Sequence, residues 1–178
     1  MRRLMLFVLG LAASLVLLPT TAVADSATHT YLLEMDAPNI GQAPNGDQIA
    51  ITGDGEFSVH PGSVEAEGTF THTDAGGTVI ATGTWEATGF IEYESYGCGE
   101  VFGDPIPPEL CGGAVKMNVT LHSPLGDLSG ILTVICVIGT HAPGAVLGPR
   151  TEGVTLNLPG IINFNHSIEG ENVFIQTS

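Results

Sequence analysis

The chain contains six histidines, and these are the side chains best suited to chemistry near neutral pH, where an imidazole changes its protonation. None stands in an H-x-H pair or beside a cysteine, so a metal site would need ligands from separate strands. His72 shares the alternation of Phe70 and Trp85 but lies at the end of its strand. We therefore expect its imidazole at the rim of an inward-facing cavity, where it could act as an acid or a base. The alternative is a rim histidine bonded to water or turn backbone, and His166 has the same two interpretations.

Other sequence patterns of catalysis are missing. There is no G-x-S-x-G elbow, no S-x-x-K and no EF-hand spacing, and the Gly53-Asp54-Gly55 segment carries an acid where a phosphate loop needs amides and lysine. The predicted hairpin places Glu65 opposite Glu86, which is either a solvated pair or a weak cation site. We expect no catalytic residue beyond the weak candidate His72, no metal site and no cofactor.

β-strands are expected to hold these side chains. The side chains of residues 63–88 alternate between two sets with a period of two. Phe70 and Trp85 have one parity, and threonines and glutamates have the other. Successive side chains of a strand point to opposite faces, so this pattern predicts an antiparallel sheet with one buried face. About nine such runs, separated by Gly, Pro, Asn and Asp, occupy the chain after residue 27, and none of the intervening segments predicts a helix.

The clearest hairpin predicts a curled sheet. With Asp74–Gly77 as a four-residue turn, Gly68 faces Gly83 and Ala66 faces Trp85. Glycines in such positions bend a sheet or allow a close approach to its backbone. We predict a single antiparallel β-barrel of eight to nine strands, because closure removes exposed edges. A two-sheet β-sandwich is the alternative.

The inward face of this hairpin, together with Phe57, supplies the candidate ligand-binding residues. They are Phe57, Gly68, Phe70, Gly83 and Trp85. We interpret the large side chains first as core residues. The second interpretation is that they form the walls of an apolar cavity, since an eight-stranded barrel can hold one small ligand.

The first 24 residues predict a secretory signal peptide. Arg2 and Arg3 precede an apolar run, and Ala22-Val23-Ala24 fits the small-residue pattern before a cleavage site. An uncleaved anchor is the alternative. Cleavage would leave residues 25–178 as one domain, located outside the cytoplasm, either secreted or periplasmic.

The expected mature chain is strongly acidic. Lys116 and Arg150 would be its only lysine and arginine against 19 acidic residues, a formal net charge of −17. Such a surface repels nucleic acids and anionic membranes, so we expect neither as a partner.

Export permits disulfides, and the chain has three cysteines. Cys98 and Cys111 bracket a loop rich in glycine and proline, and a bridge there would contribute about 3 kcal/mol in the loop-entropy model. We favour this pair, with Cys136 as a buried thiol inside an apolar run. The two other pairings stay open.

Three functions fit these observations. The first is a secreted, non-catalytic barrel that binds a small apolar ligand or serves as a surface interaction module. The second is a cofactor-free cyclase or isomerase. Allene oxide cyclase and the dirigent proteins share the architecture expected here, as lipocalins do, but this is an analogy of fold, and none of their catalytic residues maps onto this chain. The third is a structural envelope protein that forms homo-oligomers, suggested by the apolar run around Cys136.

Overall fold

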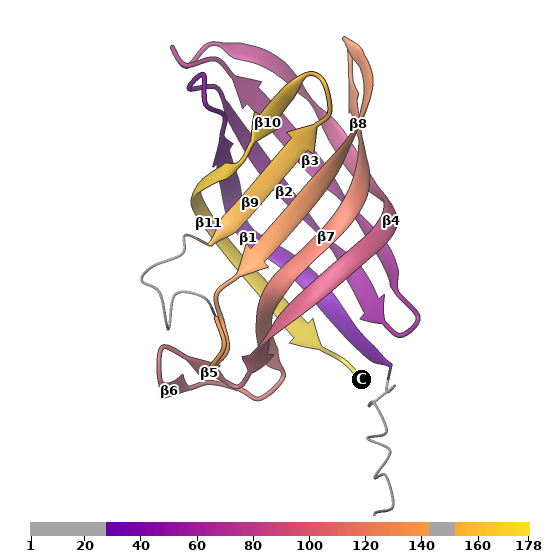
Figure 1. Ribbon diagram of the computed structural model, residues 1–178, viewed down its shortest axis with the longest axis vertical. Coiled ribbons are helices and arrows are strands. Elements are labelled where there is room, and N and C mark those ends of the chain that lie inside the picture. Colours follow the sequence, from indigo (N-terminus) through magenta and orange to yellow (C-terminus); the bar gives the residue numbers. More distant parts are fainter. Residues whose placement is uncertain (1–27, 143–151) are drawn as a thin grey trace, which may run out of the picture.

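The computed structural model describes residues 28–142 and 152–178, so the predicted signal peptide lies outside the described residues. The described chain is all-β and antiparallel (Figure 1). Its strands are β1 (His29–Gln42), β2 (Gln48–Val59), β3 (Ser63–Thr73), β4 (Val79–Cys98), β5 (Glu100–Val101), β6 (Asp104–Pro105), β7 (Leu110–Ser123), β8 (Gly126–Cys136), β9 (Gly153–Leu158), β10 (Ile162–Phe164) and β11 (His166–Gln176).

Hydrogen-bonded neighbours form a closed ring of six strands. Strands β1 to β4 pair in sequence order, β4 pairs with β7, β7 pairs with β11, and β11 returns to β1. The β7–β11 contact is short, joining Phe174 to Cys111 and Ile175 to Leu110. The remainder of β7 pairs with β8, and β9 and β10 follow β8. The pairing of the long strands β4 and β7 thus joins strands β1 to β4 to strands β8 to β10 (Figure 1).

The register of the β3–β4 hairpin differs from the sequence prediction by two residues. Gly68 faces Trp85 and Phe70 faces Gly83, rather than Gly68 facing Gly83. One residue of the difference arises because the loop extends to Thr78, where the Asp74 carboxylate accepts hydrogen bonds from the Gly76 and Thr78 amides. The other comes from an irregularity at Ile80. A shift of two keeps the side chains from Ala81 onward on their predicted face, although their partners differ from the prediction. Val79, predicted to point inward, is 56% exposed, and Ile80 lines the cavity instead.

The inward residues form a continuous core. Phe57, Trp85 and Phe174 are at most 2% exposed. At one end of the core, the rings of Tyr31, Phe57, Tyr93 and Phe174 pack with centroids 4.9–5.9 Å apart. Burial raises the pKa of the Tyr93 hydroxyl, which donates a hydrogen bond to the Gly112 carbonyl. This part of the interior is filled by the protein's own side chains.

Glycine allows Trp85 to lie against the sheet. Its indole Nε1 donates to the Thr52 carbonyl at 2.9 Å. A Cβ on Gly53 would approach the indole ring to 2.6 Å, and one on Gly68 would approach Nε1 to 2.7 Å. The close approach expected at Gly68 is therefore made by the protein's only tryptophan.

The predicted disulfide between Cys98 and Cys111 is confirmed, with 3.9 Å between the Cα atoms. It joins the end of β4 to the start of β7 and closes the segment that contains β5 and β6. Cys136 is a buried free thiol, as expected, and burial raises its pKa to about 12. Such a thiol is almost entirely protonated at neutral pH and therefore a poor nucleophile.

Candidate functional site

An apolar cavity of 330 Å³ opens at the end of the molecule opposite the aromatic cluster. Strands β2, β3, β4, β7, β8, β9 and β10 and their turns all contribute side chains to it. The cavity is lined by Ile49, Phe70, His72, Ile80, Ala81, Leu121, Ser123, Leu125, Gly126, Leu128, Leu158, Ile161 and Phe164. This lining is suited to an apolar molecule.

Part of the lining is exposed to solvent. Ile80, Leu125 and Ile161 are 46%, 78% and 62% exposed. Leu125 lies in the β7–β8 turn and Ile161 in the β9–β10 turn, at the upper end of Figure 1 and away from β5 and β6. Large apolar side chains gathered at the entrance of an apolar cavity mark a binding surface more often than isolated ones do.

His72 is the histidine of this cavity. Its Nε2 lies 3.3 Å from Oδ2 of Asp47, and the two side chains are only 19% and 15% exposed. The Phe164 ring packs against the imidazole nearly at a right angle, with centroids 5.2 Å apart. Two neighbours thus hold the imidazole in place beside an apolar space.

The sequence prediction missed Asp47, although a signal for it exists. Ser58 and Ser63 flank the short Pro61-Gly62 turn, and pairing them brings Ile49 opposite His72. Asp47 then stands two residues beyond Ile49, near the end of β3. The alternation around the β3–β4 turn does not reveal this neighbour, because it follows from the β2–β3 pairing.

The other predicted site residues divide between the cavity and the core. Phe70 lines the cavity. Phe57, Gly68, Gly83 and Trp85 do not, because Phe57 belongs to the aromatic cluster and the glycines accommodate neighbouring backbone and rings. A Cβ on Gly83 would lie 1.8 Å from the His122 carbonyl oxygen. His166 is exposed on β11 and does not line the cavity.

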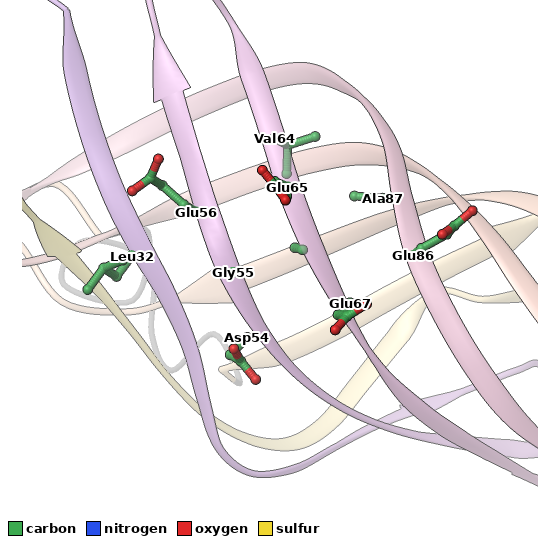
Figure 2. Close-up of a pocket in the computed structure, with 10 residues that line it drawn as sticks. Leu32, Asp54, Gly55, Glu56, Val64, Glu65, Glu67, Glu86 and Ala87 are labelled. Atoms are coloured by element: carbon green, nitrogen blue, oxygen red, sulfur yellow. The ribbon is translucent and has the colours of Figure 1, made fainter.

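A second feature is a row of carboxylates on the outward face of β1 to β4. Glu34 faces Asp54, Asp54 faces Glu67, and Glu67 faces Glu86 across neighbouring strands. The predicted Glu65–Glu86 pair is thus corrected, since Glu65 faces Glu56 instead. Figure 2 shows Asp54, Glu67 and Glu86 of this row, together with the neighbouring Glu56–Glu65 pair, around a depression that spans β1 to β4. Like charges directly opposite one another destabilise a sheet.

His122 sits beside this row. Its Nδ1 lies 3.0 Å from Asp127 and its Nε2 lies 3.5 Å from Glu86. The hydrogen bond to Asp127 raises the pKa of the imidazole, although desolvation acts against it. The side chains of His122, Glu86 and Asp127 are 40%, 58% and 66% exposed, so these ion pairs are solvated, and the hollow that His122 lines with Glu67 and Glu86 is open to solvent.

A buried polar cluster lies where β1, β8, β9 and β11 meet. The side-chain amides of Asn39 and Asn172 bond each other, and Asn172 also donates to the Ile135 carbonyl. The Glu152 carboxylate accepts hydrogen bonds from the backbone N–H groups of Asn172 and Val137. Burial raises the pKa of Glu152. These groups bond one another and the backbone, which is typical of a structural cluster.

Within residues 28–142 and 152–178, no group of three or more His, Cys, Asp or Glu side chains could hold a metal ion. The same residues contain no helix with the length and apolar character needed to span a bilayer. Comparisons with protein-family models, with curated proteins and with solved structures found no significant match.

Proposed function

We propose that this protein is an exported, non-catalytic β-barrel that binds a small apolar molecule in the cavity beside His72. The observation that carries the proposal is the 330 Å³ space itself, with its almost wholly apolar lining and exposed apolar entrance. Cavities of this size and character bury most of the surface of a small ligand. The disulfide is compatible with export.

The barrel, rather than a sandwich, is part of this proposal. It is supported by the closed ring of six strands and by β8, β9 and β10, which extend the sheet from β7. In a barrel, one end can be packed while the other holds a ligand. In this protein the aromatic cluster fills one end and the cavity lies at the other.

A neutral fluorescent probe tests the binding function. N-phenyl-1-naphthylamine should gain emission with the wild-type protein and show saturable binding. Ala81→Phe should abolish the gain, because Ala81 lines the cavity and a phenyl group would fill it. Thr82→Phe is the matched control, since Thr82 is the neighbouring, exposed residue of β4. Equal loss in both variants, or no binding by the wild type, would contradict the proposal.

The pair of His72 and Asp47 supports a second candidate, a cofactor-free isomerase or cyclase. A base at His72 would take a proton from the carbon beside a carbonyl group and return one from solvent. Exchange of the α-hydrogens of 2-octanone in D₂O, followed by NMR, measures this step directly. Exchange that exceeds the buffer rate and disappears in His72→Phe would favour the enzyme, whereas exchange at the buffer rate would favour the binding protein.

A further inference from the structure

The polar groups of the cavity narrow the choice of ligand, given the proposed binding function. Of the residues that line the cavity, only His72 and Ser123 have polar side chains. The Ser123 hydroxyl donates to the Gly126 carbonyl at 3.1 Å and accepts from the Leu125 amide at 3.2 Å. Its hydrogen is therefore used inside the β7–β8 turn. Ser123 thus cannot donate to a ligand, and of the two side chains it is His72 that has a ring nitrogen with no hydrogen-bond partner among the described residues.

Asp47 determines which nitrogen of His72 is available. An ionised carboxylate can only accept hydrogen bonds, so the nitrogen that faces Asp47, Nε2, carries the hydrogen. In a neutral imidazole the other nitrogen then has a lone pair and acts as an acceptor. Among the described residues, no side chain or backbone group hydrogen-bonds Nδ1. An acceptor beside an apolar space favours a ligand that brings a donor.

The charge of the ligand's polar group further limits which donor the cavity can accept. A carboxylate ligand would place a second negative charge near Asp47 in a chain whose formal net charge is −15, and it has no hydrogen to donate. An ammonium group could donate, but it would lose its hydration among the isoleucine, leucine and phenylalanine side chains that line the cavity. A neutral hydroxyl group incurs neither cost.

We propose that the ligand is a neutral apolar alcohol or phenol whose hydroxyl group donates a hydrogen bond to Nδ1 of His72. The apolar part of the molecule would lie against Phe70 and Phe164, and the Asp47 carboxylate would hold His72 in the accepting tautomer. The inference depends on the proposed function, because it names the class of molecule that the same cavity takes.

Two isomers of equal size test the hydroxyl group. 1-Octanol can donate a hydrogen bond and heptyl methyl ether cannot, so displacement of N-phenyl-1-naphthylamine by each gives the contribution of the donor. At pH 8, where free imidazole is neutral, 1-octanol should bind about three- to tenfold more tightly than the ether. Octanoate and octylamine should both bind more weakly than 1-octanol.

Variants connect this preference to the imidazole. His72→Phe should bring the affinity for 1-octanol down to that for the ether, and Asp47→Ala should reduce the ratio because the tautomer is no longer held. His122→Phe is the matched control, since it changes a histidine outside the cavity, and it should keep the wild-type ratio. Circular dichroism of each variant reports whether it folds, and Asp47→Ala keeps the test decisive where His72→Phe does not fold.

The possible failures are distinguishable. Equal affinity of the wild type for the two isomers, or tighter binding of octylamine or octanoate, would overturn the alcohol assignment while leaving cavity binding intact. Failure of the probe and all four compounds to bind would remove the proposed function itself. A preference for 1-octanol that persists in both His72→Phe and Asp47→Ala would also overturn the role of His72.

Discussion

Replacing Gly68 by alanine is the most direct test of the packing around Trp85. The new Cβ would lie 1.9 Å from the Thr52 carbonyl oxygen, 2.6 Å from the Gly53 Cα and 2.7 Å from Trp85 Nε1. Real Cβ atoms essentially never come within 3.0 Å of a heavy atom outside their own and adjacent residues, so β2 or β3 must move. The same movement displaces the carbonyl that accepts the hydrogen bond of the indole.

The expected loss of stability has two parts. Overpacking in a close-packed interior costs about 1–3 kcal/mol. Leaving a buried indole N–H without an acceptor costs about 1–3 kcal/mol more. We therefore expect Gly68→Ala to lower the free energy of unfolding by about 2–6 kcal/mol. Urea denaturation followed by the emission of Trp85, which is 2% exposed in the folded protein, measures this difference.

Gly89→Ala is the control for the change of residue type. A Cβ on Gly89 meets only the Asn118 side-chain nitrogen, at 3.6 Å, which is ordinary contact. This variant should match the wild type or gain up to about 1 kcal/mol from the reduced freedom of the unfolded chain. A Gly68→Ala protein whose stability lies within about 0.5 kcal/mol of the wild type, the range of an ordinary surface substitution, would refute the reasoning.

Three further predictions concern charge. Because burial raises the folded-state pKa of Glu152 above its ordinary value of 4.5, this group contributes stability below pH 4.5 that is lost as pH rises through the folded-state pKa. The stability of Glu152→Gln relative to the wild type should therefore increase between pH 4 and 7 in urea denaturation, and a constant difference would contradict the cause given. His122 should titrate above 6.5 in NMR, and Asp127→Asn should lower its pKa because the largest cause is their hydrogen bond; an unchanged titration would show that another group is responsible. Glu67→Gln should stabilise the protein by about 0.5–1 kcal/mol at low salt, since Glu67 has a carboxylate opposite it on both neighbouring strands, and the gain should shrink at 1 M NaCl. A gain that does not depend on salt would exclude charge repulsion as its source.

The sequence contained enough information to predict the faces of the strands. Alternation over residues 63–88 placed Phe70 and Trp85 inward, and the structure buries both. The disulfide and the buried thiol were predictable as well, because one pair of cysteines flanks a loop and the third lies in an apolar run. These features follow from local patterns, which a single sequence displays directly.

Pairing was less predictable, because it depends on extra residues that the alternation hides. The loop after Thr73 and the irregularity at Ile80 each add one residue, and their sum leaves the parity of β4 unchanged. A pattern with a period of two cannot detect a shift of two. The shift also hid the Glu67–Glu86 pair. The other two pairs of the row, Glu34–Asp54 and Asp54–Glu67, depend on the β1–β2 and β2–β3 registers, which the alternation alone does not specify.

The candidate site required contacts between distant segments. His72 was identified because its parity and its place at a strand end are local properties. Its neighbours come from other segments, Asp47 from the β1–β2 turn and Phe164 from β10, 92 positions further along the chain than His72. The interaction-module and envelope functions stay predictions.

The seam between β1 and β11 has a consequence for biogenesis. It pairs Tyr31 with Gln176, so the ring closes only after the last of its strands has left the ribosome and, if the chain is exported, crossed the membrane. Until then β1 presents an unpaired edge, which is a template for aggregation. Contacts between such distant residues also slow folding. A chaperone that shields the β1 edge during this interval would therefore increase the yield of folded protein more than one that acts on the hairpins.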